Sequence, residues 1–193
     1  MTRLALFFSG TGGNALNLLR ACREGRVPAQ AVLGLASTPK AGGIPRLEAQ
    51  ALPVAVVVRP DFPDDGAFSA ACYARAEAAG ADCIALCGWL KRLEVPERWA
   101  GRILNIHPAL LPAFGGAGMW GMHVHRAVLA AGAAESGCTV HLVDNVYDHG
   151  RILAQARVPV LPGDTAEDLQ QRVYAQEMRL YPEALAGFLP TLH

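Results

Sequence analysis

The sequence predicts an α/β protein built around a mostly parallel sheet, and three observations support this. Short apolar runs alternate with segments of helical spacing through the first half of the chain, as is typical of parallel sheets. The apolar run 4–8 leads into a glycine-rich turn at 9–14 and then into helical spacing at 15–22. The last two predicted strands, 137–143 and 151–160, are joined by a short polar turn. Together these patterns indicate a three-layer α/β/α, Rossmann-like fold with a seven-stranded sheet and an antiparallel C-terminal addition.

The individual elements follow from apolar runs, turn residues and helical periodicity. Strands that are covered on both faces lack polar alternation, so mostly apolar runs predict strands at 4–8, 31–36, 54–58, 83–87, 103–106 and 137–143. In 151–160, Ile152, Ala154, Ala156 and Val158 fall on one face, which predicts the last strand. Helical spacing predicts helices at 15–22, within 41–52, at 68–79, 95–100 and 122–131, and from the capping residues 164–167 to 180. Gly80 and Gly132 follow two of these helices as stop residues. Pro182 is expected to begin a separate last helical segment.

Length and composition limit the kinds of protein that this chain can be. Its 193 residues suffice for one domain with a full core. Lys and Arg total 17, as do Asp and Glu, so no excess of positive charge indicates a nucleic-acid partner. Five cysteines without a CxxC pair favour a reduced, cytoplasmic protein. No apolar run is long enough to cross a membrane, and no HxxxH or HExxH spacing indicates a metal site.

Two polar residues, Asn105 and His107, stand at the end of the predicted strand 103–106. Side chains two positions apart on a strand point to the same face. Pro108 has no backbone donor, so strand pairing should end there. Open α/β sheets bind their ligands at the carboxyl ends of strands, where the glycine-rich turn 9–14 is also expected. The sequence therefore predicts a site between this turn and the Asn-His pair.

Asp148, in the polar turn before the last strand, completes a candidate set with Asn105 and His107. An imidazole carries protons near neutral pH, and an amide donates a hydrogen bond to a developing oxyanion. A carboxylate beside the imidazole holds it protonated. No serine or cysteine lies in a nucleophile motif, so the substrate should bring its own nucleophile, such as an amine that attacks an acyl carbon. His141, in a neighbouring strand, is expected to support this set rather than to react.

Several motifs together carry a resemblance to a known family. They are Ser-Gly-Thr-Gly-Gly-Asn at 9–14, Asn-Ile-His-Pro-Ala-Leu-Leu-Pro at 105–112, and the segments 124–128, 139–141, 148–155, 176–177 and 181–182. Over nearly its whole length the chain resembles the folate-dependent formyltransferases, specifically the phosphoribosylglycinamide formyltransferases of de novo purine (IMP) synthesis. The resemblance implies a single formyltransferase domain, 1–193, with a phosphate-binding half at 1–100 and a catalytic half at 101–193. It also implies small-molecule partners, and a monomer or a homodimer.

The activity implied by the resemblance is direct formyl transfer. The amine of glycinamide ribonucleotide would attack the formyl carbon of 10-formyltetrahydrofolate, which is a co-substrate, and no metal is involved. His107 would carry the proton, and Asn105 would polarise the formyl group. Asp148 would raise the pKa of His107, so that a protonated imidazole meets the oxyanion.

The resemblance also implies binding roles for two groups of residues. Gly12, Gly13 and Asn14 would hold the phosphate of the ribonucleotide, and Glu177 would lie near its glycinamide end. The folate would contact Leu90, Lys91, Arg92, Leu93, Asn105, Asp144, Asn145, Val146 and Tyr147.

Two positions depart from the family's pattern. The loop after the third strand often carries an Arg that helps to bind folate, but here Asp65 stands nearest to that position. Either Arg59 or Lys91 would then replace this contact. Tyr174 stands where a Gln is common beside the substrate.

Three alternative functions stay open from the sequence. One is another folate-dependent formyltransferase, acting on methionyl-tRNA or a nucleotide sugar, which would carry a further domain or a different phosphate turn. The second is a formyltetrahydrofolate hydrolase, which shares the catalytic motif but carries an additional N-terminal regulatory domain. The third is a nucleotide-binding module without catalytic activity, which the intact set of Asn105, His107 and Asp148 argues against.

Overall fold

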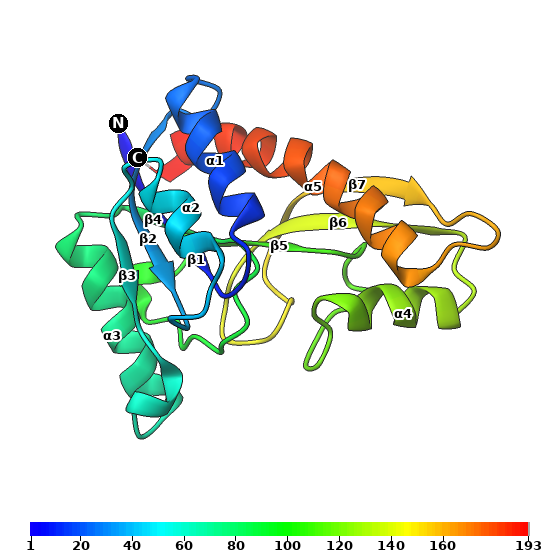
Figure 1. The fold of residues 1–193 in the computed structure, drawn as a ribbon, viewed down its shortest axis with the longest axis horizontal. Coiled ribbons are helices and arrows are strands. Elements are labelled where there is room, and N and C mark those ends of the chain that lie inside the picture. Colours follow the sequence, from blue (N-terminus) through cyan, green and yellow to red (C-terminus); the bar gives the residue numbers. More distant parts are fainter. Residues whose placement is uncertain (193) are drawn as a thin grey trace.

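The structure is a computed structural model, and it describes residues 1–192. A seven-stranded sheet with the order β3-β2-β1-β4-β5-β6-β7 forms its centre (Figure 1). The strands are β1 (Thr2–Phe8), β2 (Ala29–Ala36), β3 (Val54–Val56), β4 (Cys83–Leu86), β5 (Ile103–His107), β6 (Glu135–Leu142) and β7 (Ile152–Pro159). The pairs among the first five strands are parallel, and β6 and β7 add antiparallel to β5. The predicted fold class is confirmed.

Helices cover both faces of this sheet (Figure 1). The helices are α1 (Gly13–Arg23), α2 (Gly43–Glu48), α3 (Asp65–Ala78), α4 (Met122–Ala130) and α5 (Ala166–Phe188), with single 3₁₀ turns η1 (Arg59–Asp61), η2 (Glu97–Trp99) and η3 (Leu189–Leu192). Side chains of α1, α2, α4 and α5 pack in one core cluster, and those of α3 pack in the other. In residues 1–192, no helix is both long and apolar enough to cross a membrane.

The strand β1 shows why the predicted strands read as continuous apolar runs. Leu4, Leu6 and Phe8 belong to the core cluster beneath α1 and α5, whereas Ala5 and Phe7 belong to the cluster beneath α3. Because successive side chains point to opposite faces, a strand between two layers of helices must be apolar at every position.

The third strand and the helix predicted at 95–100 are shorter than the sequence predicts. Strand β3 ends at Val56 instead of residue 58, because its only neighbour, β2, ends at Ala36, the residue that pairs with Val56. The helix predicted at 95–100 is only the turn η2, because Pro96 before it and Ala100 after it have non-helical ψ angles of 162° and 128°.

The prediction that Pro182 begins a separate helical segment is wrong. Pro182 lies inside α5, which runs without a break from Ala166 to Phe188. Proline lacks the N–H that would bond to the carbonyl four residues earlier. That carbonyl belongs to Met178, and the side chain of Asn17 in α1 donates to it over 2.7 Å. A neighbouring helix thus satisfies the group that proline leaves free.

Candidate active site

A cavity of about 610 Å³ opens at the carboxyl ends of β1, β4 and β5. Its walls include the glycine-rich turn after β1 and the Asn105–His107 end of β5, which the sequence predicted would lie at one edge of the sheet. The segment after β4, the loop 116–121 and the polar turn before β7 complete the walls, and α5 closes one side. This volume is in the range of small-molecule binding sites.

The structure brings all the predicted site residues together. Those that line the cavity are Gly12, Gly13, Asn14, Leu90, Lys91, Arg92, Leu93, Asn105, His107, Asp144, Asn145, Val146, Tyr147, Asp148 and Glu177. Of the two cations considered as replacements for the missing Arg, only Lys91 lines the cavity. Arg59 instead donates to Asp65 over 2.6 Å and to the carbonyl of Phe62.

The glycine-rich turn after β1 lies at one end of the cavity and leads into α1. Gly12 has a φ of 70°, and a Cβ there would stand 2.9 Å from the Cα of Gly43. A Cβ on Gly13 would stand 2.0 Å from the hydroxyl oxygen of Tyr174. Gly12 therefore has no room for a Cβ, whereas a Cβ at Gly13 would require the Tyr174 side chain to move. The N-terminal N–H groups of α1 lie within reach of an anion in the cavity.

Glu177 of α5 lies beside this turn and is 8% exposed. The side-chain amide of Asn14 donates to its Oε2 over 2.8 Å. Burial raises the pKa of Glu177 to about 7, although the hydrogen bond from Asn14 lowers it. Glu177 therefore exchanges a proton near neutral pH, unlike an ordinary carboxyl group.

We expect Glu177 to make folding stability depend on pH. Between about pH 4.5 and about 7 the unfolded chain releases this proton while the folded protein keeps it. The contribution of Glu177 to the free energy of unfolding should therefore fall as the pH rises through this window, by about 3 kcal/mol, and level off above it. Urea unfolding of the wild type and of Glu177→Gln at several pH values measures the effect. Parallel stability curves for the two proteins across the window would contradict it.

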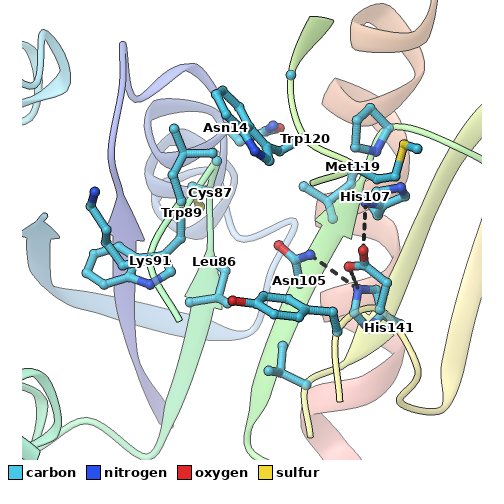
Figure 2. Close-up of a pocket in the computed structure, with 18 of the residues that line it drawn as sticks. Asn14, Leu86, Cys87, Trp89, Lys91, Asn105, His107, Met119, Trp120 and His141 are labelled. Carbon is cyan, nitrogen blue, oxygen red and sulfur yellow. Dashed lines mark hydrogen bonds and ion pairs between the residues drawn. The ribbon is translucent and has the colours of Figure 1, made fainter. Parts of the chain in front are cut away.

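His107 lies at the centre of the cavity wall, and its side chain is nearly buried. Its Nε2 lies 2.8 Å from the carbonyl oxygen of Phe114. Because a carbonyl only accepts, Nε2 carries a hydrogen and donates it. Its Nδ1 lies 3.5 Å from Oδ2 of Asp148, as the dashed line at His107 in Figure 2 shows. A proton taken up by this ring would therefore face the carboxylate.

The prediction that His107 is held protonated is wrong for the free protein. Burial lowers its pKa, and the charge of Asp148 and the hydrogen bond to Phe114 raise it by less. The net pKa lies below the ordinary value of 6.5, so the ring is neutral at pH 7. The direction of the influence of Asp148 is as expected, but burial, which depends on the tertiary packing, outweighs it.

Asp148 is held in place by backbone geometry and by hydrogen bonding. It has a φ of 53°, which is uncommon for a residue with a Cβ and recurs at functional sites. The backbone N–H of Gly116 donates to its Oδ2 over 3.0 Å. Burial raises the pKa of Asp148, but the neighbouring ring of His141, the charge of His107 and the N–H of Gly116 bring it below the ordinary value. Asp148 is therefore ionised at pH 7.

The contacts of the loop 114–116 with these two residues are not visible in the sequence. The loop reaches His107 through a backbone carbonyl and Asp148 through a backbone N–H, and backbone groups leave no trace in residue types. His125 of α4 also lines the cavity, and its buried Nδ1 has no hydrogen-bond partner among residues 1–192. Within this described part of the chain, no three His, Cys, Asp or Glu side chains gather to hold a metal ion.

Comparison with known proteins identifies the class to which this fold and site belong. The family model described as formyl transferase matches residues 2–185. The chain belongs to the formyl transferase family.

Several similar proteins within this class are named for the transfer of a formyl group to glycinamide ribonucleotide. The chain is 41% identical over 188 residues to a chloroplastic phosphoribosylglycinamide formyltransferase of Arabidopsis thaliana, covering 96% of this chain and 64% of that protein. It is 33% identical to the phosphoribosylglycinamide formyltransferase of Haemophilus influenzae, covering 97% and 87%. The crystal structure of glycinamide ribonucleotide transformylase 1 from Symbiobacterium toebii superimposes with a TM-score of 0.93 at 38% identity, covering 99% and 89%.

Some of these relatives are much longer than this chain. It spans 13% of the trifunctional purine biosynthetic protein adenosine-3 of Drosophila pseudoobscura pseudoobscura, at 39% identity. The chain therefore corresponds to one part of that protein.

Proposed function

We propose that this protein transfers the formyl group of 10-formyltetrahydrofolate to the amine of glycinamide ribonucleotide, a step of purine synthesis. The observation that carries the proposal is one cavity that joins Asn105, His107 and Asp148 to a glycine-rich turn at a helix N-terminus. The names of the similar proteins support the same reaction.

The two substrates would occupy different ends of the cavity. The turn of Gly12, Gly13 and Asn14 is suited to the phosphate of the ribonucleotide, because it presents backbone N–H groups at the start of α1 and its two glycines have no side chains to cover them. Glu177 would lie near the glycinamide end. The folate would bind along Leu90, Lys91, Arg92 and Leu93, with Asn105 and the turn Asp144, Asn145, Val146 and Tyr147 completing its contacts. Lys91 supplies a cation there that a carboxylated ligand would attract.

In the proposed reaction the amine attacks the formyl carbon, and the carbonyl electrons move onto the oxygen. Asn105 stabilises this oxyanion by donating a hydrogen bond. Neutral His107 accepts the proton that the attacking nitrogen loses, and Asp148 stabilises the resulting imidazolium. His107 then passes the proton to the folate nitrogen as the bond from that nitrogen to the formyl carbon breaks. The products are the formylated amine and a folate N–H.

This sequence of proton transfers requires one change at His107. Its Nε2, the atom that would receive the proton, already carries a hydrogen that it donates to the carbonyl of Phe114. We propose that the substrates displace this carbonyl, after which Nδ1 carries the hydrogen toward Asp148. The lone pair of Nε2 is then free to accept the proton of the amine.

The proposal extends to the setting in which the protein works. The single domain 1–193 would act on small molecules rather than on nucleic acid or membranes, as a monomer or a homodimer. Its phosphate-binding half would be 1–100 and its catalytic half 101–193, with Glu177 reaching back to the first half through Asn14. The five cysteines are all free, which supports a reduced cytoplasmic location.

One assay tests the activity against its alternatives. The protein is mixed with 10-formyltetrahydrofolate, with and without glycinamide ribonucleotide, and folate absorbance is followed. Turnover that needs the ribonucleotide supports the proposal. Turnover without it indicates a hydrolase, and no turnover in either mixture indicates a binding module.

Replacing Gly12 with alanine should weaken binding of the ribonucleotide. The new Cβ would meet the backbone of Gly43 and force a left-handed φ on a residue that resists it. A strain of this kind costs about 1–3 kcal/mol, so we expect KM for the ribonucleotide to rise about tenfold or more. Steady-state kinetics measure this. Gly187→Ala in α5, where a Cβ has open space, is the matched control and should change neither KM. An unchanged KM in Gly12→Ala would contradict the phosphate assignment.

A further inference from the structure

His141 is a buried residue of the cavity for which the reaction above needs no role. It lies on β6 directly opposite Asn105 of β5, in the antiparallel register of the two strands. Side chains at such paired positions stand next to each other on one face of the sheet. His141 is 2% exposed, so water does not compete for its contacts.

The two ring nitrogens of His141 have different and unequal partners. Nδ1 lies 2.8 Å from the carbonyl oxygen of Leu142, which only accepts, so Nδ1 carries the hydrogen. In the neutral ring Nε2 is then a bare acceptor. Nε2 lies 3.2 Å from the amide nitrogen of Asn105, which only donates. The backbone carbonyl of Leu142 therefore selects the tautomer, and the tautomer selects which end of the Asn105 amide faces the ring.

The direction of the Asn105 amide decides what it offers to a substrate. Figure 2 shows its nitrogen toward His141 and its oxygen on the side away from that ring. One amide hydrogen is held by Nε2, and the other remains available as a donor. A carboxamide turned by 180° has nearly the same shape but exchanges donor and acceptor, so packing alone does not choose between the two directions.

Asp148 does not replace Asn105 as the partner of His141 in this state. Its Oδ1 lies 3.6 Å from the same Nε2, which is beyond hydrogen-bonding distance. Only a doubly protonated ring would turn this contact into an ion pair, and that ring could no longer accept from Asn105. The amide direction therefore depends on an Nε2 that carries no hydrogen.

We propose that His141 is a positioning residue that fixes the direction of the Asn105 amide, so that its nitrogen serves the oxyanion. The effect on catalysis rests on the formyl transfer proposed above. The hydrogen-bonding arrangement itself does not, and it is tested separately from activity.

The catalytic test compares two replacements of His141. Gln places a side-chain oxygen near the position of Nε2 and keeps an acceptor for Asn105, whereas Leu keeps the bulk without an acceptor. We expect kcat to fall roughly 10- to 100-fold in His141→Leu, as for other groups that orient a reacting side chain, with both KM values within about twofold. His141→Gln should recover most of this loss. Equal losses in the two variants would overturn the proposal.

A double-mutant cycle tests whether His141 acts through Asn105. In an Asn105→Ala background, the further change His141→Leu should cost almost nothing in kcat, because the side chain to be oriented is gone. If the fold loss in kcat of the double variant equals the product of the losses in the two single variants, His141 acts independently of Asn105, and the proposal is overturned.

The arrangement is tested without activity by ¹⁵N NMR of the folded wild type at about pH 8, where an ordinary imidazole is neutral. We expect His141 to be protonated on Nδ1 and unprotonated on Nε2, with an Asn105 amide hydrogen bonded to Nε2. A hydrogen on Nε2 would overturn the proposal even if formyl transfer is normal. The expected spectrum from a protein that transfers no formyl group would instead overturn the proposed function and leave the arrangement standing.

Discussion

Replacing His107 with alanine should lower kcat for formyl transfer by about two to four orders of magnitude, the usual range for a general acid–base group. The variant lacks the group that takes the proton from the attacking amine and returns it to the folate nitrogen. Both KM values should change little, because the ring acts on a proton that moves only during the reaction. The loss should therefore lie in kcat, which steady-state kinetics measure.

The control for this variant must separate chemistry from folding. The side chain of His107 is 3% exposed and hydrogen-bonded to the carbonyl of Phe114, so its removal also lowers the free energy of unfolding. Circular dichroism and urea unfolding should show that the variant is folded at the assay temperature. His149→Ala removes a largely exposed imidazole next to Asp148 in the sequence, and because its ion-pair partner Asp144 is assigned to folate binding and not to the proton transfer, it should retain the wild-type kcat. A folded His107→Ala protein with near-normal turnover would contradict the assigned role.

Replacing Asp148 with asparagine should have the second largest effect, lowering kcat by about two orders of magnitude or more. The amide still offers an oxygen to the N–H of Gly116 but no charge to His107. The charge of Asp148 raises the pKa of His107, so its loss should lower that pKa further and weaken the imidazolium that forms during transfer.

The pH profile of kcat/KM gives this prediction its sign. Activity needs neutral His107, so kcat/KM of the wild type should fall at acid pH, with a midpoint below 6.5, the ordinary pKa of histidine. In Asp148→Asn this midpoint should move to lower pH still. Asp61→Asn, which removes an exposed carboxylate outside the cavity, should leave the profile in place. A midpoint that stays or moves to higher pH in Asp148→Asn would exclude Asp148 as the group that stabilises the charged ring.

The parts of the fold and site that could be predicted from the sequence are those set by neighbouring residues. The apolar run 4–8 and the glycines after it correctly predicted β1, its turn and α1, because each of these depends on residues close together in the chain. The spacing of Asn105 and His107 before Pro108 placed both side chains on one wall of the cavity for the same reason.

The features that could not be predicted depend on contacts between distant segments. Pro182 does not break α5 because Asn17, in another helix, bonds to the carbonyl that proline leaves free. Burial lowers the pKa of His107, and burial becomes known only once the segments around it are packed. The hydrogen bond from His107 goes to the backbone carbonyl of Phe114, and a backbone contact cannot be predicted from residue types.

The most direct test of the central claim follows the formyl carbon itself. The protein is incubated with 10-formyltetrahydrofolate labelled in that carbon, together with glycinamide ribonucleotide, and the label is located after partial turnover. Direct transfer predicts that the label appears on the ribonucleotide amine, in equal amount to the folate released, with none on the protein. Label recovered as formate, or bound to a side chain of the protein, would contradict the account.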